Sequence, residues 1–213
     1  MKAVIFDMDG VISDTNYLHS SVESAILAGY GIELQPKEIV KRFAGVSDNE
    51  MFSEVFSEAG KGKPDMSSIA SRKWERMLNP QPGEIVAIPG TVEFILTLQQ
   101  QSIPMAVASA SSMAFINLVL STLKLTNVFH TLVSADEVVH GKPAPDVFLL
   151  AAERLGALPE TCVVIEDGVS GMIAAQAAGM QCVGLLTHLT AEECPTNLVI
   201  SNLRDLPLER IGL

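Results

Sequence analysis

The sequence predicts an α/β protein with a doubly wound, Rossmann-like parallel sheet and an inserted group of helices. Three observations predict this fold. From residue 88 onward, short apolar runs alternate with helix-like segments, which is typical of parallel βαβ units. Between residues 15 and 81 no run resembles a strand. Aliphatic residues are plentiful and aromatic residues are few, which suits a parallel sheet that helices cover on both faces.

The first strand and the helical insert divide the chain in two. Val4 to Phe6 is a short apolar run of the kind that forms a strand buried on both faces. Four helices are predicted after it. The first covers residues 15–30, the next two lie between residues 36 and 60 with a break at Gly45, and the last covers residues 67–78. The predicted domains are therefore an α/β core of residues 1–14 and 82–213 and a helical domain of residues 15–81.

The rest of the chain alternates between the two kinds of element. Helices are predicted at residues 91–101, 112–123, 145–155 and 170–178, and strands at residues 104–108, 131–134, 162–165 and 181–186. The tail after residue 192 is expected to add one strand at residues 198–200 and a short final helix. A length of 213 residues is enough for one core of good size, or for one core with a modest accessory domain.

Composition excludes several classes of partner. The formal net charge is −11, from 14 basic and 25 acidic residues, and no basic run is present. Nucleic acids and anionic membranes require a cationic surface, so neither is an expected partner. No membrane-length apolar run and no secretory signal is found, and the three cysteines lack metal-ligand spacing. We expect a cytoplasmic protein that is a monomer or a weak homodimer.

Two carboxylates directly follow the first strand. Asp7 and Asp9 would be costly to bury unless a cation, hydrogen bonds or water met them. In open α/β sheets, ligands bind beyond the carboxyl ends of the strands, so this is a candidate reaction centre. A metal ion there would also reverse the negative field that otherwise repels a phosphate ester. The alternative is a solvated Asp-Gly turn.

Three further segments carry candidate residues. Ser109 follows a predicted strand, where a hydroxyl and backbone N–H groups can hold phosphate oxygens. Lys142 lies at the start of a predicted helix, where a cation requires an anionic partner. Glu166 and Asp167 end another buried strand, at the same sheet edge as Asp7, and offer oxygen ligands suited to Mg²⁺. The ordinary alternatives are a turn serine, a solvated lysine and a helix N-cap pair.

These four segments, in this order, resemble the four motifs of the haloacid dehalogenase superfamily, whose first motif is similar to DMDGVISDT at residues 7–15. The superfamily includes phosphatases and phosphomutases with an aspartate nucleophile. The resemblance implies that Asp7 is the nucleophile, Asp9 the acid and base, Ser109 a phosphate ligand and Lys142 the cation that offsets charge during transfer. Asp9 favours phosphatases and mutases, because dehalogenases lack this acid.

The resemblance also implies a Mg²⁺ site. Its ligands would be Asp7, the backbone carbonyl of Asp9, Asp167, and Glu166 either directly or indirectly. Many relatives carry Ser or Thr after this Asp, whereas this chain has Gly168. We expect that this change removes a side-chain hydrogen bond and leaves the metal site intact.

The helical insert resembles the small cap of the branch that contains β-phosphoglucomutases and sugar-phosphate phosphatases. In the mutases, the equivalents of His19 and Lys73 form a pair that couples cap closure to Asp9. The alternatives here are a packed surface histidine and a solvated lysine. The predicted substrate-binding residues are Gly10, His19, Gly45, Val46, Ser47, Lys73, Ala110 and Ser111.

One residue that differs from the mutases favours a phosphatase over a mutase. The cap loop is followed by Asp48, where the mutases carry an Arg that grips the second phosphate of a bisphosphate. A carboxylate there loses that contact and adds repulsion. The predicted function is therefore a Mg²⁺-dependent phosphatase, acting through an aspartyl phosphate on a small phosphate monoester such as a sugar or polyol phosphate.

Two rivals to this function are kept. A phosphohexomutase would need Arg42, Arg72 or Arg76 in place of the missing Arg. A non-catalytic binding or regulatory protein could also use the same fold.

Overall fold

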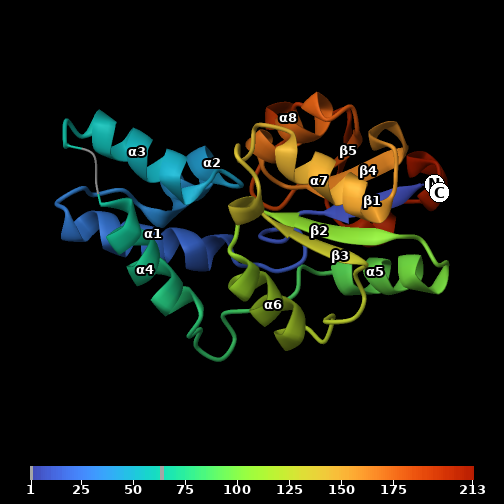
Figure 1. The fold of residues 1–213 in the computed structure, drawn as a ribbon, viewed down its shortest axis with the longest axis horizontal. Coiled ribbons are helices and arrows are strands. Elements are labelled where there is room, and N and C mark those ends of the chain that lie inside the picture. Colours follow the sequence, from blue (N-terminus) through green and yellow to red (C-terminus); the bar gives the residue numbers. More distant parts are fainter. Residues whose placement is uncertain (1, 63–64) are drawn as a thin grey trace.

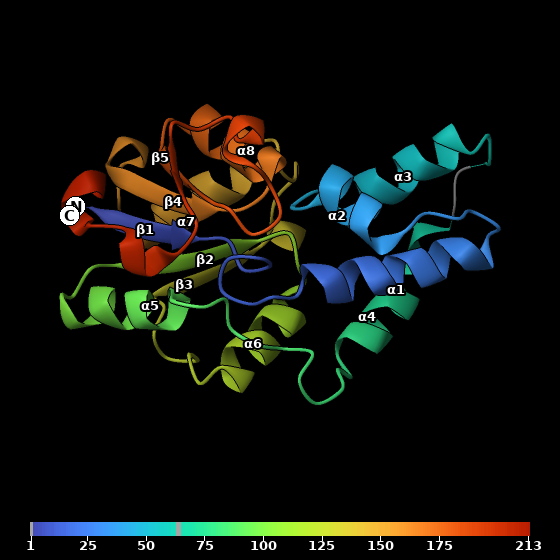
Figure 2. The ribbon, with the colours of Figure 1, turned by 180° about the vertical axis from the view of Figure 1, so that it is seen from behind.

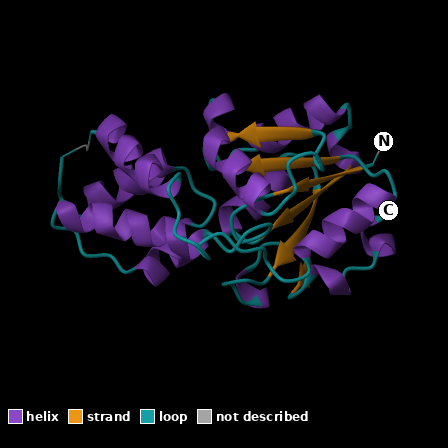
Figure 3. Ribbon diagram, turned by 90° about the horizontal axis from the view of Figure 1, so that it is seen from below, coloured by secondary structure: helices purple, strands orange, loops and turns teal. Residues whose placement is uncertain are grey.

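The computed structural model describes residues 2–62 and 65–213. Six parallel strands form one sheet in the order β3-β2-β1-β4-β5-β6. Figure 3 shows the strands running toward the same side of the molecule. The strands are β1 (Ala3–Phe6), β2 (Met105–Ser109), β3 (Thr131–Ser134), β4 (Cys162–Glu166), β5 (Gln181–Leu185) and β6 (Leu198–Ile200). The predicted fold class is confirmed.

The central position of β1 follows from its composition. All four of its residues are buried, because it is flanked by β2 and β4 and covered on both faces. Phe6 lies opposite Val107 and Ile165 in the two neighbouring strands. The three central strands therefore end at nearly the same level, and the residues that follow them meet at one edge of the sheet.

Two layers of helices cover the sheet. Helices α7 (Asp146–Leu155) and α8 (Val169–Ala177) lie on one face, and α5 (Thr91–Gln100) and α6 (Met113–Thr122) on the other (Figure 1). Successive strand residues point to opposite faces, so alternate residues of β1 join two separate apolar cores. The predicted final helix is replaced by 3₁₀ turns at Leu203–Asp205 and Leu208–Ile211.

The segment between β1 and α5 forms a separate group of helices, here called the helical insert. It contains α1 (Asn16–Gly29), α2 (Pro36–Phe43), α3 (Asp48–Glu58) and α4 (Met66–Met77), and no strand lies among its described residues. Figures 1 and 2 show it beside the carboxyl ends of the strands. The Ser47 and Asp65 side chains cap α3 and α4, which explains where these helices begin.

The two connections between sheet and insert lie side by side. Ser13 forms a backbone bridge with Ala87, and its hydroxyl donates to the carbonyl of Val86 at 3.1 Å. This pairing holds the insert over the edge where β1 and β4 end. In the part of the chain that the structure describes, no helix has both the length and the apolar character needed to span a bilayer.

Candidate functional site

Three carboxylates converge at the carboxyl edge of the sheet. Asp7 directly follows β1. Glu166 is the last residue of β4, and Asp167 follows it. One oxygen of each lies within 4.8 Å of the others, and all three residues are buried. The parallel pairing of β1 with β4 produces this convergence, as the sequence predicted from two strand ends.

Lys142 supplies one positive charge to this cluster. Its Nζ donates to Asp7 Oδ1 at 2.5 Å and to Glu166 Oε1 at 2.8 Å, and it lies 4.8 Å from the Phe148 ring centroid. Burial opposes the charged form of Lys142, but Asp7 and Glu166 outweigh burial and raise the pKa of the lysine. Lys142 therefore remains a cation, with the anionic partners that its position before α7 was predicted to require.

One ammonium does not balance three carboxylates. Burial raises the pKa of Asp7 well above its usual value, and repulsion from Glu166 and Asp167 adds to this although Lys142 opposes it. A buried cluster of oxygen ligands with surplus negative charge is what a divalent cation such as Mg²⁺ requires. The residues present therefore fit a metal ion held by Asp7, Asp167 and Glu166.

Asp167 is oriented by residues from three segments. Its Oδ2 accepts hydrogen bonds from Asn16 Nδ2 at 2.8 Å and Thr187 Oγ1 at 2.9 Å, and His188 Nδ1 lies 3.2 Å away. Gly10 has a φ of +85°, and a Cβ on it would lie 1.9 Å from the same oxygen. Gly10 is thus required for packing against Asp167. The sequence did not indicate Asn16, Thr187 or His188, because nothing in their local pattern signals a shared partner.

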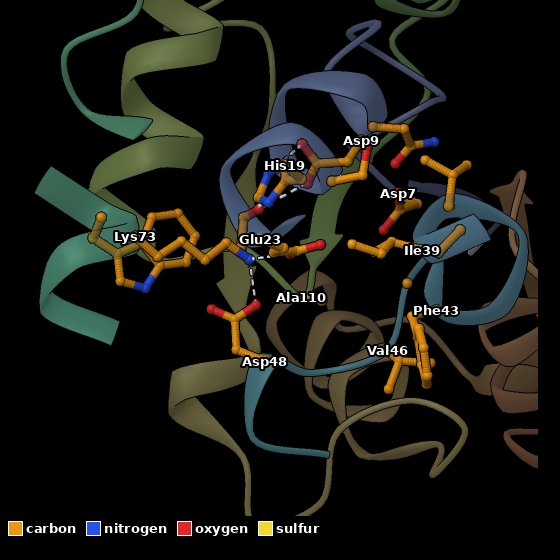
Figure 4. Close-up of a pocket in the computed structure, with 17 residues that line it drawn as sticks. Asp7, Asp9, His19, Glu23, Ile39, Phe43, Val46, Asp48, Lys73 and Ala110 are labelled. Carbon is orange, nitrogen blue, oxygen red and sulfur yellow. Dashed lines mark hydrogen bonds and ion pairs between the residues drawn. The ribbon is translucent and has the colours of Figure 1, made fainter. Parts of the chain in front are cut away.

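Asp9 accepts several hydrogen bonds. Thr15 Oγ1 donates to its Oδ1 at 2.5 Å, where His19 Nε2 also lies at 3.2 Å. Ser111 Oγ and Ser109 Oγ donate to its Oδ2 at 2.8 and 3.2 Å. Burial would raise the pKa of Asp9, but the interactions with His19 and the hydroxyl donors outweigh it and lower the pKa. Asp9 is therefore a carboxylate held beside Asp7 (Figure 4).

A pocket with a volume of about 50 Å³ lies between the sheet edge and the insert. Figure 4 shows side chains from both parts directed toward it. Of the predicted site residues, those that line it are Asp7, Asp9, His19, Gly45, Val46, Lys73, Ala110 and Ser111. Its lining does not include the other predicted site residues, which are Gly10, Ser47, Ser109, Lys142, Glu166 and Asp167. Ser47 instead accepts the backbone N–H of Glu50 as the N-cap of α3.

The contacts of Lys73 differ from those implied by the mutases. Its Nζ donates to Glu23 Oε1 at 2.6 Å and to Asp48 Oδ1. His19 contacts Asp9 and packs edge-on against the Trp74 ring at 6.0 Å. Within the described residues, His19 and Lys73 therefore do not pair with each other. The sequence analysis missed Glu23, which sits one helical turn after His19 on α1.

None of the described residues that line this pocket is an arginine that could replace the phosphate clamp of the mutases. Arg42 pairs with Glu54 at 3.1 Å and Glu58 at 2.6 Å on the surface of the insert. Arg72 and Arg76 line a different hollow, bounded by α1 and by the segment that returns to the sheet. The three arginines named as replacements therefore lie outside the pocket that contains Asp7.

Gly168 lets the insert approach the sheet closely. A Cβ on Gly168 would lie 2.7 Å from the carbonyl oxygen of Ala44, which ends α2. The same carbonyl accepts a hydrogen bond from Ser170 Oγ at 3.0 Å. A Ser or Thr after Asp167 would therefore collide with the insert in this arrangement. This steric conflict explains why position 168 is a glycine.

The comparisons with known proteins agree on one protein family. The family model described as haloacid dehalogenase-like hydrolase matches residues 4–185. The chain is 34% identical over 180 residues to fructose-1-phosphate phosphatase YqaB of Escherichia coli strain K12, covering 84% of this chain and 94% of that protein. It is 30% identical over 216 residues to β-phosphoglucomutase of Bacillus subtilis strain 168, covering 98% and 93%.

Two further matches extend this result. A hydrolase from Pseudomonas syringae has a similar structure, with a TM-score of 0.89, 28% identity and full coverage of both chains. The chain is also 34% identical over 194 residues to Protein SUPPRESSOR OF QUENCHING 1 of Arabidopsis thaliana, covering 89% of this chain but 18% of that longer protein. With the family model spanning most of its length, the chain belongs to the haloacid dehalogenase-like hydrolases.

Proposed function

We propose that this chain is a Mg²⁺-dependent phosphatase that hydrolyses a small phosphate monoester with a sugar or polyol group. The observation that carries the proposal is the meeting of Asp7, Lys142 and Asp167 at one sheet edge, where Asp7 and Asp9 line a pocket. The name of the relative YqaB, a fructose-1-phosphate phosphatase, supports the substrate class.

In this proposal Asp7 attacks phosphorus and forms an aspartyl phosphate while the ester oxygen departs. Asp9 is ionised before substrate binds, so it must first take up a proton, as the phosphoryl oxygens take over the hydrogen bonds of Ser109 and Ser111. It gives that proton to the departing oxygen, then takes a proton from the water that hydrolyses the aspartyl phosphate and frees Asp7. Lys142 holds Asp7 in place through Oδ1. A bound Mg²⁺, held by Asp7, Asp167, Glu166 and the Asp9 carbonyl, would neutralise charge on the phosphoryl group.

Ser109 and Ser111 complete the proposed phosphate site. Both hydroxyls already contact Asp9 Oδ2, and the Ser111 backbone N–H donates to Ser109 Oγ at 3.0 Å. Hydroxyl and N–H groups after a strand are suited to phosphate oxygens. Ala110 lies between them on the pocket wall.

The helical insert is proposed to be a cap, residues 15–81, over a core of residues 1–14 and 82–213. Its supporting observation is that the pocket has walls from both parts. A cap that closes over substrate excludes water until the aspartyl phosphate has formed. A cytoplasmic location and a monomeric or weakly dimeric state stay predictions.

The test is release of inorganic phosphate from a panel of sugar and polyol monophosphates, with Mg²⁺ and with EDTA. We expect turnover with Mg²⁺, loss of turnover with EDTA, and a fall of at least about 10³-fold in kcat for Asp7→Asn. Isomerisation of hexose 1-phosphates to 6-phosphates is followed in parallel, and isomerisation without net phosphate release would favour the phosphohexomutase. An Asp7→Asn variant as active as the parent would exclude the proposed nucleophile.

A further inference from the structure

The pocket wall contributed by the insert carries three charged side chains that the catalytic steps do not use. Glu23 lies on α1, Asp48 begins α3 and Lys73 lies on α4. Lys73 bonds to both carboxylates and is 1% exposed, while Glu23 is 7% exposed. We call these three residues the insert triad. All three line the pocket that contains Asp7 and Asp9 (Figure 4).

The triad has one negative charge in excess. Burial opposes the charged form of Lys73, but Asp48 and Glu23 outweigh burial and raise its pKa, so its charge is already matched inside the protein. Among the described residues that line the pocket, Lys73 and His19 are the only basic side chains. His19 is engaged with Asp9. A second anionic group on a substrate would therefore meet two carboxylates and no unengaged cation.

The same carboxylates offer acceptors to hydroxyl groups. Glu23 uses Oε1 and Asp48 uses Oδ1 to hold Lys73, which leaves one further oxygen on each carboxylate. An ionised carboxylate accepts hydrogen bonds and donates none, so its natural partners in a substrate are hydroxyl donors. An apolar leaving group would bury these oxygens without partners, which is unfavourable.

We propose that the insert triad determines specificity by accepting monophosphates whose remaining part is an uncharged polyhydroxylated chain or ring, and by rejecting substrates with a second phosphate or a carboxylate. This inference rests on the proposed phosphatase function and adds the residues that select its substrate. It assigns Glu23 and Asp48 to hydroxyl binding and Lys73 to holding both carboxylates in position.

The test compares three substrates on the full chain with Mg²⁺: a hexitol 6-phosphate, a hexose 1,6-bisphosphate and phenyl phosphate. The parent protein should prefer the hexitol phosphate to the bisphosphate by about 100-fold or more in kcat/KM. For each protein, kcat/KM for the hexitol phosphate is divided by kcat/KM for phenyl phosphate. This ratio should be about 10-fold lower in Asp48→Asn than in the parent. The preference over the bisphosphate should also fall, because one repelling charge is gone.

Two further variants make the result specific. Glu23→Gln removes the other carboxylate. It should also lower the preference for the hexitol phosphate over phenyl phosphate and over the bisphosphate. Glu54→Gln is the matched control, since Glu54 lies on α3 like Asp48 but is an exposed partner of Arg42 outside the pocket. It should keep the ratios of the parent. Thermal unfolding of each variant confirms that the compared proteins are folded.

The outcomes separate the two proposals. If the parent hydrolyses phenyl phosphate and the hexitol phosphate equally well, or if Asp48→Asn and Glu23→Gln both keep the parent ratios, the specificity role is overturned and the phosphatase function stands. If the parent releases phosphate from none of these monoesters, both proposals are overturned.

Discussion

At the scale of single residues, small side chains decide how closely the insert and the sheet can approach. Gly168 leaves room for the Ala44 carbonyl, and a Cβ on Gly45 would lie 3.0 Å from Ser170 Oγ. The Ser170 hydroxyl then joins the two parts through its hydrogen bond to Ala44. The sequence alone indicated that Gly168 departs from relatives, but its steric role depends on a residue 124 positions earlier in the chain.

Replacing Gly168 by Ser should push the Ala44 carbonyl away from the sheet, because the new Cβ would lie 2.7 Å from that oxygen. Displacing the wall of the pocket misplaces substrate, so we expect kcat/KM to fall about 10-fold. Gly62→Ser is the control, since no atom of the described residues outside its chain neighbours lies within 4 Å of a Cβ there. Steady-state kinetics on the hexitol phosphate checks the prediction, and equal values for the two variants would contradict it.

Lys142 is the second residue whose change has a defined result. Lys142→Met leaves Asp7 and Glu166 buried beside each other without their shared cation, so the free energy of unfolding should fall by about 3–5 kcal/mol in EDTA. Lys41→Met removes an exposed pair with Glu193 and should cost less than about 1 kcal/mol. Urea unfolding of both variants measures the difference, and similar losses would show that the buried contacts of Lys142 contribute little.

At the scale of elements, the helix that opens the insert also reaches the metal site. Asn16 is the first residue of α1, and its side-chain amide donates to Asp167 Oδ2. Thr187, after β5, donates to the same oxygen. Asp167 is thereby fixed between the insert and the sheet, which links the position of α1 to the orientation of a proposed metal ligand.

Asn16→Ala removes one of these donors and should weaken Mg²⁺ binding about 10-fold, because a ligand that has lost its supporting hydrogen bond is less well oriented. Calorimetric titration of Mg²⁺ into the full chain measures this without relying on turnover. Asn79→Ala is the control, since Asn79 donates to the Glu75 carbonyl at the end of α4. Unchanged affinity in Asn16→Ala would remove the proposed link.

The elements themselves were largely predictable, and the site was predictable only in part. Short apolar runs indicated the strands, and the parallel order placed Asp7 and Asp167 at one edge of the sheet before the structure was known. The Glu23 to Lys73 contact could not be predicted, because it joins helices whose packing depends on side-chain shape. The expected final helix became 3₁₀ turns, since the tail is too short and too rich in turn residues to form a longer helix.

At the scale of the whole molecule, the negative charge and the metal site are connected. The chain carries 14 basic and 25 acidic residues, a net charge of −11. Three of the acids are buried together beside one lysine. A divalent cation that binds only the folded chain would relieve this repulsion and stabilise the fold.

Mg²⁺ should therefore raise the free energy of unfolding, by about 2.7 kcal/mol when its free concentration is 100 times Kd. Thermal unfolding in MgCl₂ and in NaCl of equal ionic strength separates specific binding from screening. Asp167→Asn should lose most of the Mg²⁺ effect, because it removes a ligand charge from the cluster. An equal rise in Tm in both salts would indicate screening alone.

The first and last residues that the structure describes lie close together, far from the pocket. Lys2 lies beside Gly212, at the amino edge of the sheet, while the helical insert lies beyond the opposite edge (Figure 1). A surface that captured this protein through a tag at either terminus would hold every copy in one orientation, with the pocket turned toward the solution. A fusion partner attached at residue 213 would likewise sit behind the enzyme, where it obstructs neither substrate entry nor product exit.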